Sequence, residues 1–539
     1  MSNHFKKVID RSMWVPTAVT PTAHAAGGSI TSDLRNNISR VPFAYQLGSA
    51  TVLNRYNFVS KAWESVVSPA LGGTFGAGAG ITFAPSFAIV GNIGVGSTTS
   101  SIVTSTTLTA VGANMLANRG GSGEYGYEIR IIGKSAGGSG KIERRWIIGN
   151  TGGTTPTILL DTPLSFTPAN GDTYEILSGK VYMLSASTLA ATIFRSFEIA
   201  TNTLTSLSNT NLNATISLDS SFVVLDEQYV PYDHIPGEGF VVDPANTFNG
   251  GLHRCLKATA TAAGSITGQA TAGDATLLEN EYRNFQIRIV EDVTEPTAVG
   301  QRRIIKSHTA GASPVYTIGA NWTVTPTATA KFVIEYPNLI LLWTSGDGVT
   351  YTYNYTDAAI NNGTATINAN AWHTTYFGAR GANMGAGCIS FPSFGIEPDA
   401  AKNARHSNIF SFRGGASNTL DLLDIAGGAA GLWSNAIVYD KGSKTHTTGA
   451  CGAYAPFDNE GRFGYINSYT ASLANQLWRF DVKNRVLQAW TPTDWIQSGT
   501  AAVGNRIAAC AALDGSDDYT VLLLIAHLST VTQEIVVQS

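Results

Sequence analysis

The sequence predicts an all-β protein: a β-propeller of five or six blades, with six favoured, that carries two homologous inserted β-rich modules and an N-terminal arm. Three observations lead to this prediction. Only 13% of the 539 residues are charged, while Gly, Ala, Thr and Ser dominate, a composition that favours short strands and turns over helices. A strand–turn–strand signature recurs along the chain, and one long segment is present in two copies. Internal repetition of this kind is typical of propellers.

The first predicted element is the arm, over residues 1–45, where apolar periodicity is weak. Two behaviours are open for it: an arm that becomes ordered on a neighbouring subunit during assembly, or a flexible tail. The start of the chain lacks the apolar core and cleavage site of a secretory signal, and no stretch approaches the length of a membrane span. We therefore expect a protein that is made in a cytoplasm and is not inserted in a membrane.

A hairpin signature marks the blades. An alternating apolar run with an aromatic residue is followed, after a polar turn, by a second strand with Trp or Leu, and period-2 alternation on both sides indicates two paired strands. The five copies lie at residues 52–66, 193–207, 349–375, 419–435 and 476–490. We assign the propeller to residues 46–90, 180–258 and 338–539.

Strands rich in small residues lie between these hairpins. "GAGITFAPSFAI" (78–89) and "GAGCISFPSFGI" (385–396) resemble each other, and so much Gly and Ala suits the innermost strand of a blade, where strands converge near the axis. Cys388, Cys451 and Cys510 lie in such strands. Together with Cys255 they form no CxxC pair, so buried thiols are favoured over two disulfides, and a zinc or redox site is not expected.

The two ends of the chain are predicted to share one blade. The last segment, residues 518–539, supplies strands but lacks the closing Trp hairpin, and the first hairpin lacks strands before it. Joining the ends would close the ring and remove exposed sheet edges.

The duplicated segment predicts two inserted modules, at residues 91–179 and 259–337. Residues 128–179 align without a gap to residues 286–337, at a constant offset of 158. The matched pairs include Ile129/Ile287, Arg130/Arg288, Ile131/Ile289, Arg144/Arg302, Arg145/Arg303, Ile147/Ile305, Pro156/Pro314, Thr167/Thr325, Pro168/Pro326 and Ile176/Ile334.

A glycine-rich loop in the first copy, "GKSAGGSGK" (133–141), invites comparison with a phosphate-binding loop. That motif needs G-x-x-x-x-G-K-[ST] between a strand and a helix. Here Glu128 stands where the glycine before Lys134 is required, and Ile142 follows Lys141. The second copy has the acidic "VEDVTEPTAVGQ" in this place, so we interpret the loop as a hairpin turn that is free to vary and binds no phosphate.

Six arginines recur in the two copies and are candidate interface residues. They should lie on paired strands of a hairpin and meet across it. One interpretation is contact with a partner subunit or an acidic surface, and the other is solvated strand faces paired with local Glu and Asp. The residues are Arg130, Arg144, Arg145, Arg288, Arg302 and Arg303.

No catalytic, metal or cofactor site is predicted. The stretch 225–240 gathers Asp226, Glu227, Asp233 and Glu238, and a glycosidase needs two carboxylates about 5–10 Å apart. Turns between blade strands are equally rich in these residues, however, and the Asp-box repeats of sialidase propellers are missing. The nine histidines are dispersed, no GxSxG elbow occurs, and the net charge of −4 provides no basic field for nucleic acid.

Several phrases resemble virion structural proteins of tailed bacteriophages. They are "IRIIGKSAGGSGKIERRWIIGNTGGTTPTILLD", "DEQYVPYD", "QRRIIKSHTAGASPVYT" and "RFDVKNRVLQAW", and the resemblance extends from about residue 45 to the end. It implies a multi-copy structural component, since propellers serve in phage tails as rings around the DNA channel. It implies no catalytic residues.

We therefore expect a non-enzymatic tail or neck protein that is assembled in the host bacterial cytoplasm and resides in the virion. Its copies should form a sixfold or twelvefold ring around the tail axis, because heterologous contacts that close give rings. Propellers would form the wall, and the inserted modules would contact neighbouring subunits and other tail or neck proteins. The alternatives are a receptor- or glycan-binding tail protein and, with less support, a glycan-degrading propeller enzyme.

Overall fold

The computed structural model describes the chain in segments. They are residues 14–16, 29–32, 43–47, 53–58, 60–64, 80–86, 88–93, 107–110, 127–135, 140–169, 171–185, 193–212, 220–227, 234–235, 239–240, 255–269, 277–392, 408–439, 450–454, 463–470, 473–482, 484–489, 506–511, 519–525 and 532–538, with a few single positions between them. In these segments the fold is all-β, with one short 3-10 helix, η3 (Pro296–Ala298). No helix among the described residues is long and apolar enough to cross a membrane.

Six four-stranded antiparallel sheets can be traced in the described segments, each named here from its first strand in the sheet to its last. Sheet 1 is β2 (Ser29–Ser32), β3 (Phe43–Leu47), β4 (Leu53–Asn57) and β5 (Ala62–Glu64); sheet 2 is β6 (Gly80–Ala84), β13 (Lys180–Leu184), β14 (Phe194–Glu198) and β15 (Thr203–Leu207); sheet 3 is β16 (Ser221–Leu225), β25 (Leu339–Trp343), β26 (Tyr351–Asn354) and β29 (Ala371–His373). Sheet 4 is β30 (Ile389–Pro392), β31 (Asn408–Phe412), β32 (Thr419–Asp424) and β33 (Leu432–Val438); sheet 5 is β34 (Cys451–Tyr454), β35 (Phe463–Thr470), β36 (Leu473–Asp481) and β37 (Val486–Ala489); sheet 6 is β38 (Arg506–Ala511), β39 (Tyr519–Ile525), β40 (Thr532–Gln538) and β1 (Trp14–Pro16).

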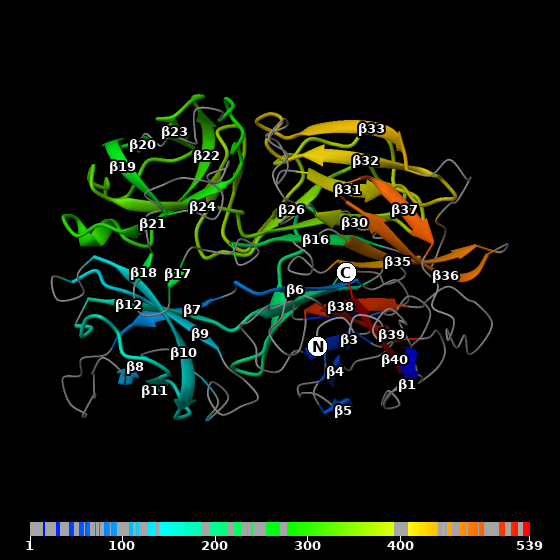
Figure 1. The fold of residues 1–539 in the computed structure, drawn as a ribbon, viewed down its shortest axis with the longest axis horizontal. Coiled ribbons are helices and arrows are strands. Elements are labelled where there is room, and N and C mark those ends of the chain that lie inside the picture. Colours follow the sequence, from blue (N-terminus) through cyan, green and yellow to red (C-terminus); the bar gives the residue numbers. More distant parts are fainter. Residues whose placement is uncertain are drawn as a thin grey trace, which may run out of the picture.

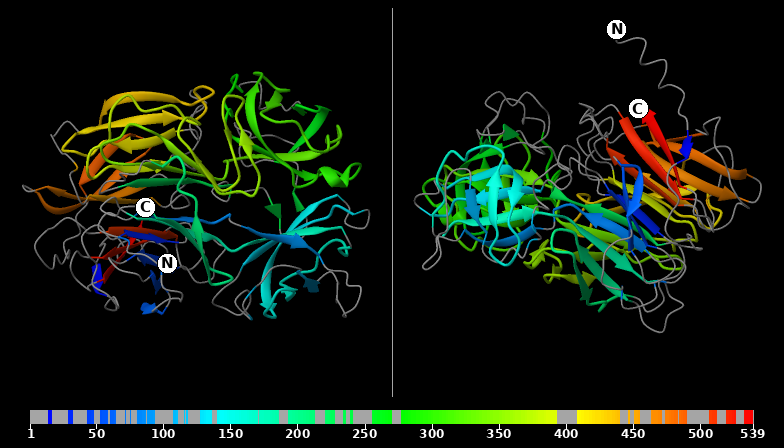
Figure 2. Two further views of the ribbon diagram at one scale, coloured as in Figure 1. Left: turned by 180° about the vertical axis from the view of Figure 1, so that it is seen from behind. Right: turned by 90° about the horizontal axis from the view of Figure 1, so that it is seen from below.

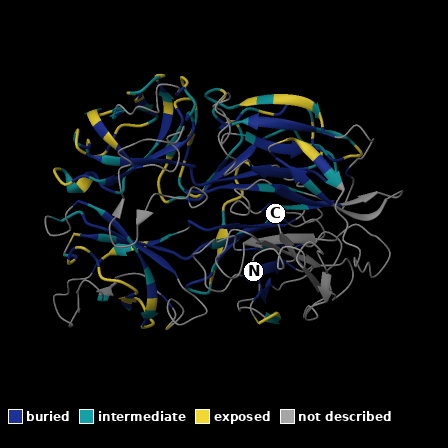
Figure 3. Cartoon of the chain, viewed as in Figure 1, coloured by how far each residue is buried: buried dark blue, intermediate teal, exposed yellow. Residues whose placement is uncertain are grey.

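The sheets are arranged in a cycle. Their first strands contact one another in the order β2, β6, β16, β30, β34, β38 and back to β2, which gives a propeller-like arrangement on the right of Figure 1. Small residues permit this convergence: a Cβ added to Gly452 of β34 would lie 2.5 Å from the Cγ2 of Ile389 in β30. Aromatic side chains fill the space between neighbouring sheets, as where the rings of Phe410 and Phe480 meet at 5.4 Å. The dark-blue strands of Figure 3 show this buried core.

The five hairpins predicted from the aromatic signature are confirmed, and each contains the third and fourth strands of a sheet. The small-residue strands are also confirmed as first strands. Cys388 precedes β30, and Cys451 and Cys510 lie in β34 and β38. Cys255, Cys388 and Cys451 are buried thiols that form no disulfide, as predicted.

The prediction of an arm over residues 1–45 is wrong for the described part of that segment. Trp14 of β1 lies opposite Ile535 of β40, and β2 and most of β3 belong to sheet 1. Pairing satisfies the backbone groups of these short strands. The two ends of the chain do share a sheet, as expected, but through β1 rather than through the first hairpin.

Two six-stranded barrels interrupt consecutive sheets at the same point, between the first and second strands. Barrel 1 separates β6 from β13 and contains β7 (Ala88–Asn92), β8 (Thr107–Thr109), β9 (Glu128–Ile132), β10 (Ile142–Asn150), β11 (Thr157–Leu160) and β12 (Thr173–Leu177). Barrel 2 separates β16 from β25 and contains β19 (Cys255–Ala262), β20 (Ser265–Gly268), β21 (Gln286–Glu291), β22 (Arg302–His308), β23 (Val315–Ile318) and β24 (Lys331–Glu335). The two-stranded ribbons are β17 (His234–Ile235) with β18 (Gly239–Phe240), and β27 (Ile360–Asn361) with β28 (Thr366–Ile367).

The barrels share one strand order. Barrel 2 runs β20-β23-β22-β21-β24-β19, and β19 pairs with β20 to close it. Barrel 1 runs β8-β11-β10-β9-β12-β7, and a bridge between Ile93 and Ala110 joins its two edges. The offset of 158 carries β11 onto β23 and β12 onto β24 residue for residue. The predicted duplication thus corresponds to two copies of one barrel, which lie together at one end of the molecule in both views of Figure 2.

Candidate functional site

The two barrels meet each other and sheet 3 at a buried charged junction. Its centre is Glu227, which follows the end of β16 and is almost fully buried. Arg130 of barrel 1 donates to Glu227, and Arg302 of barrel 2 donates to the same carboxylate at 3.1 Å. Arg302 also donates to both oxygens of Glu175 in barrel 1, at 2.9 Å each. One arginine therefore links the second barrel to the first barrel and to sheet 3.

Groups of barrel 2, together with Asn338 just before β25 of sheet 3, complete the junction. Arg288 is fully buried and donates to Glu335, with Nη2 at 3.1 Å from the carboxylate. The amide of Gln286 lies between two carboxylates and donates to Glu335 at 2.7 Å and to Glu227 at 3.3 Å. Asn338 holds Glu227 from both sides, since its amide donates to the carboxylate and its oxygen accepts from the backbone N–H. Each buried carboxylate here is balanced by the positive charge of a neighbouring arginine, and removal of either partner would leave the other charge unpaired away from water.

The arginines keep both central carboxylates ionised. Burial alone would raise the pKa of Glu175, but the charges of Arg302 and Arg130 outweigh it and lower that pKa to about 2. Burial is likewise the largest influence on Glu227, and it is overcome by Arg302, Arg130 and Arg288, which hold its pKa well below 4.5. A carboxylate this acidic cannot serve as a general acid near neutral pH. The junction is therefore suited to holding surfaces together.

Acid should loosen this junction over a defined range. The pKa of Glu175 is about 2 in the folded protein against an ordinary value of 4.5, so the unfolded chain takes up the proton first as the pH falls. The stability that Glu175 contributes is complete above about pH 4.5 and is lost progressively toward pH 2. Acid unfolding followed by tryptophan fluorescence should show a shallower pH dependence in this range for Glu175→Gln than for the native protein. Equal slopes would contradict the assignment.

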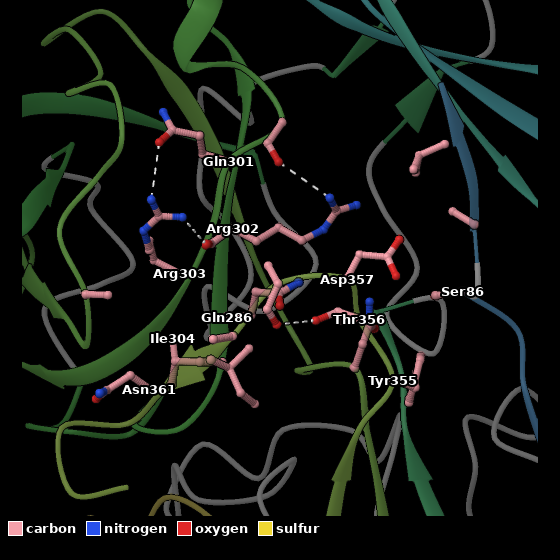
Figure 4. A pocket seen from close by; sticks show the side chains of 18 of the residues that line it. Ser86, Gln286, Gln301, Arg302, Arg303, Ile304, Tyr355, Thr356, Asp357 and Asn361 are labelled. Atoms are coloured by element: carbon pink, nitrogen blue, oxygen red, sulfur yellow. Dashed lines mark hydrogen bonds between the residues drawn. The ribbon is translucent and has the colours of Figure 1, made fainter. Parts of the chain in front are cut away.

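A pocket of about 550 Å³ opens beside the junction. Its wall comes from barrel 1, from β22 of barrel 2 and from the segment 355–361 that follows β26. In Figure 4, Arg302 extends across the pocket toward the side of Ser86 and Asp357, whereas Arg303 turns away toward Gln301. Most of the polar lining is neutral amide and hydroxyl, with Asp357 as an exposed carboxylate. Such a lining can hydrogen-bond hydroxyl groups of a ligand.

Two further ionisable groups lie near Asp357. Lys180 of β13 is directly opposite Glu198 of β14. Burial lowers the pKa of Lys180, although the negative charges of Glu198 and Asp357 act to raise it. Burial also raises the pKa of Glu198, although the positive charge of Lys180 acts to lower it. These groups form a polar edge between sheets 2 and 3, next to the pocket.

The predicted meeting of arginines across the hairpins is confirmed. Arg130 is directly opposite Arg144, and Arg288 is directly opposite Arg302. The expectation that they face a partner subunit or solvent is wrong for Arg130 and Arg288, which are fully buried in the junction. The reason is that the two barrels and sheet 3 cover this strand face. The interface that these residues build is internal to the chain.

The other candidate arginines are also held within the chain. Arg144 forms a two-pronged pair with Glu128, with both N···O distances at 2.5 Å. Arg145 is buried against Glu143 and the backbone oxygen of Pro163. Arg303 stacks over Trp322 at 5.5 Å, and the hydrogen bonds described for it go to neutral groups.

The glycine-rich loop also has an internal partner. It is a hairpin turn between β9 and β10, as predicted, and positions 136–139 lie outside the described residues. Its last part is not free to vary, because its backbone pairs with barrel 2. The oxygen of Gly140 accepts from the N–H of Asp292 at 2.7 Å, and the backbones of Lys141 and Glu291 form an isolated antiparallel β-bridge. This contact corrects the expectation of an unconstrained loop.

The carboxylates of 225–240 do not form an open pair where they are described. Asp226 is buried and accepts from Ser86 and from the hydroxyl of Tyr355 at 2.5 Å, while Glu227 is held by arginines. Asp233 and Glu238 lie outside the described residues. No group of His, Cys, Asp and Glu suited to a metal ion occurs in the described segments.

Sequence reasoning missed Glu175 as a central residue of the junction. The signal that could have found it is the repeat itself, because the offset of 158 aligns Glu175 with the apolar Val333 of the second copy. An acid at such a position, inside the apolar strand "TYEIL", needs a buried partner. Gln286 and Asn338 gave no such signal, since amides occur throughout the chain.

Comparisons with known proteins do not assign the chain to a family. No protein-family model matches it, and no curated protein matches it. Among solved structures, an α-L-arabinanase of Penicillium chrysogenum complexed with arabinobiose shares 9% identity over 98% of each chain, with a TM-score of 0.31. A leech intramolecular trans-sialidase shares 9% identity over 99% of this chain and 95% of its own, with a TM-score of 0.23.

A third solved structure, a protein of unknown function from Bacteroides thetaiotaomicron, shares 7% identity over 81% of this chain and 95% of its own, with a TM-score of 0.21. At these scores the likenesses carry no argument about activity. The all-β, propeller-like arrangement rests on the strand pairing described above.

Proposed function

We propose that this chain is a structural, non-catalytic component of a tailed-bacteriophage virion, built on a six-bladed β-propeller. It would act in many copies as a tail or neck protein that forms a ring around the tail axis, after assembly in the host cytoplasm. The attribution to a phage rests on the sequence phrases that resemble virion structural proteins. The structural role rests on the shape and construction of the molecule.

The observation that carries the structural role is the junction. Two copies of one barrel are inserted at the same point of consecutive sheets, and Arg302 and Arg130 tie both to Glu227. The central carboxylates are held ionised by arginines and are buried, so their chemistry stabilises a rigid three-part body. A rigid body with several faces is what a protein that works by packing against neighbours requires.

The location of the protein in phage particles tests the proposal. Purified virions of the phage that encodes the chain should contain it at many copies by quantitative mass spectrometry. Antibodies against the chain should label the tail axis, and averaged electron-microscopic images should show a sixfold or twelvefold ring with paired lobes. Absence of the protein from purified virions would overturn the proposal, and labelling confined to fibre tips would favour the second candidate.

The second candidate is a glycan-binding tail protein. The pocket favours it, because Asp357 and neutral amides line a hollow large enough for a small saccharide. A panel of host saccharides should then show one that binds, and Asp357→Asn should weaken that binding. Ser208→Ala, on the exposed loop after β15, serves as the matched control because Ser208 does not line the pocket.

A further inference from the structure

The two barrels surround an equivalent arginine with different partners. The offset of 158 makes Arg145 of barrel 1 equivalent to Arg303 of barrel 2. The Nη2 of Arg145 donates to the carboxylate of Glu143 at 2.6 Å, and that carboxylate also accepts from the backbone N–H of Ser165 at 3.0 Å. The buried arginine of barrel 1 therefore has its counter-charge on the same strand.

Barrel 2 keeps this hydrogen-bonding arrangement but lacks the negative charge. Gln301 stands at the position of Glu143, and Thr323 at that of Ser165. The side-chain oxygen of Gln301 accepts from the N–H of Thr323 at 2.8 Å and from Arg303 at 3.4 Å. The other hydrogen bonds described for Arg303 end on two backbone oxygens and on the hydroxyl of Thr323. Among the described residues, Arg303 is thus held by neutral groups alone.

Arg303 is fixed in place at the wall of the pocket of about 550 Å³ beside the junction. Its guanidinium lies over the ring of Trp322, at 5.5 Å from the ring centre. Burial lowers the pKa of Arg303, because a cation that is partly removed from water is disfavoured when no negative charge offsets the loss. Its Nη1 donates to the oxygen of Arg302 within the described segments, so one N–H of that nitrogen has no described acceptor. An anion in the pocket would supply the missing charge and an acceptor.

The rest of the pocket indicates what the remainder of the ligand is. Arg302 adds no uncompensated charge, because it is paired with Glu175 and Glu227. Asp357, the exposed carboxylate, and Arg303 lie on opposite sides of Arg302 in Figure 4. Most of the other polar groups of the wall are hydroxyls and amides, which hydrogen-bond to sugar hydroxyl groups. The pocket therefore suits a ligand with one acidic group and several hydroxyl groups.

We propose that this pocket binds a sugar acid, whose carboxylate pairs with Arg303 and whose hydroxyl groups are bound by the amides and hydroxyls of the wall. The ligand would supply to Arg303 the charge that Glu143 supplies to Arg145, and a guanidinium matches the planar shape of a carboxylate. The inference rests on the second candidate function, since it names the class of saccharide that the pocket takes. Phosphate and sulfate share the negative charge, so the test includes an anion without a sugar.

Matched ligands test the role of the carboxylate. Glucuronate, galacturonate and mannuronate each differ from a neutral hexose only at C6, where a carboxylate replaces a hydroxymethyl group. Isothermal titration calorimetry on the whole chain gives the dissociation constants of both members of each pair. The acid that binds best should bind roughly tenfold or more tightly than its neutral parent, as expected for hydrogen bonds to a charged group. Sulfate should bind more weakly than that acid.

Gln301→Glu tests the site without removal of the arginine. It gives barrel 2 the acid that barrel 1 carries, so Arg303 gains an internal counter-charge and the preference for the acid over its neutral parent should fall to about one. The matched control, Ser208→Glu, adds the same charge on the exposed loop after β15, outside the pocket, and should keep the preference. Gln301 also donates to the oxygens of Ala298 and Val324, so thermal unfolding is measured for each variant.

Arg303→Lys keeps the test decisive if Gln301→Glu does not fold. This variant retains a positive charge but loses the planar fork, so the preference for the acid should fall by roughly threefold or more. A preference that survives both changes would place the carboxylate elsewhere and overturn the inference.

The ligand series separates failure of this inference from failure of the second candidate function. Equal binding of acids and neutral parents would overturn the inference and leave the glycan-binding candidate standing. Binding of sulfate as tight as that of the best acid would show an adventitious anion site and overturn it as well. If no saccharide of either kind bound, the inference and the glycan-binding candidate would fail together, whereas the location of the protein in virions is tested separately.

Discussion

Replacing Glu227 by glutamine is expected to lower the free energy of unfolding by about 3–5 kcal/mol, the largest single effect at the junction. The change removes one negative charge beside Arg130, which is fully buried, and beside Arg302, whose side chain is 24% exposed where it lines the pocket. Arg130 and Arg288 would lose charge compensation at positions that water does not reach, and Arg302 would lose it at the wall of the pocket. Urea unfolding monitored by tryptophan fluorescence measures the change.

The control is the same substitution at a paired acid near the surface. Glu291 accepts from Lys331 at 2.8 Å, and both side chains are partly exposed. Glu291→Gln should therefore change the free energy of unfolding by less than about 1 kcal/mol. If the two variants were equally destabilised, the special role of the buried junction would be refuted.

Gly140→Ala is expected to cost roughly 2–4 kcal/mol, through backbone strain and a collision between the barrels. Gly140 has a φ of +64°, which L-residues adopt only at a cost. A Cβ at this position would also lie 2.2 Å from the backbone oxygen of Asp292, so one barrel would have to move away from the other. Thermal unfolding should show a lower Tm, and proteolysis between the barrels should become faster.

Gly171→Ala separates these two causes. Gly171 also has a positive φ, +99°, but nothing lies within 4 Å of an added Cβ. This variant suffers strain without a collision and should cost about 1–2 kcal/mol, with no change in proteolysis between the barrels. A loss as large as that of Gly140→Ala would show that the collision contributes nothing.

The sheets could be predicted because their signal is local. Period-2 alternation with an aromatic residue identifies the outer hairpins, such as the one around Phe197, since each strand has one face toward a neighbouring sheet. The barrels could be predicted as a duplication for a different reason: equivalent strands keep equivalent residues, and a gapless offset is visible without knowledge of the fold. β1 could not be predicted, because its three residues are too few to show alternation. It is a strand only because its backbone pairs with β40.

The junction could be predicted only in part. The arginine pairs follow from the hairpin register, as at Arg130 and Arg144. Their burial does not, because the covering acid Glu227 is 97 positions from Arg130 and comes from another sheet. Alternation within "EIRII" suggests a solvent-facing arginine, and this inference fails wherever both faces of a strand are covered. The pocket likewise depends on how barrel 1, barrel 2 and the segment 355–361 meet.

The pairing of β1 with β40 has a consequence for the order in which the molecule forms. Trp14 and Ile535 are 521 positions apart, so sheet 6 can gain its fourth strand only after all the residues between them have been synthesised. Closing so long a loop adds little to the free-energy cost, because that cost grows only with the logarithm of length, but contacts between distant segments form slowly. Ring closure is therefore a late step of folding. Until it occurs, the edge of β40 stays open to strands of other nascent chains.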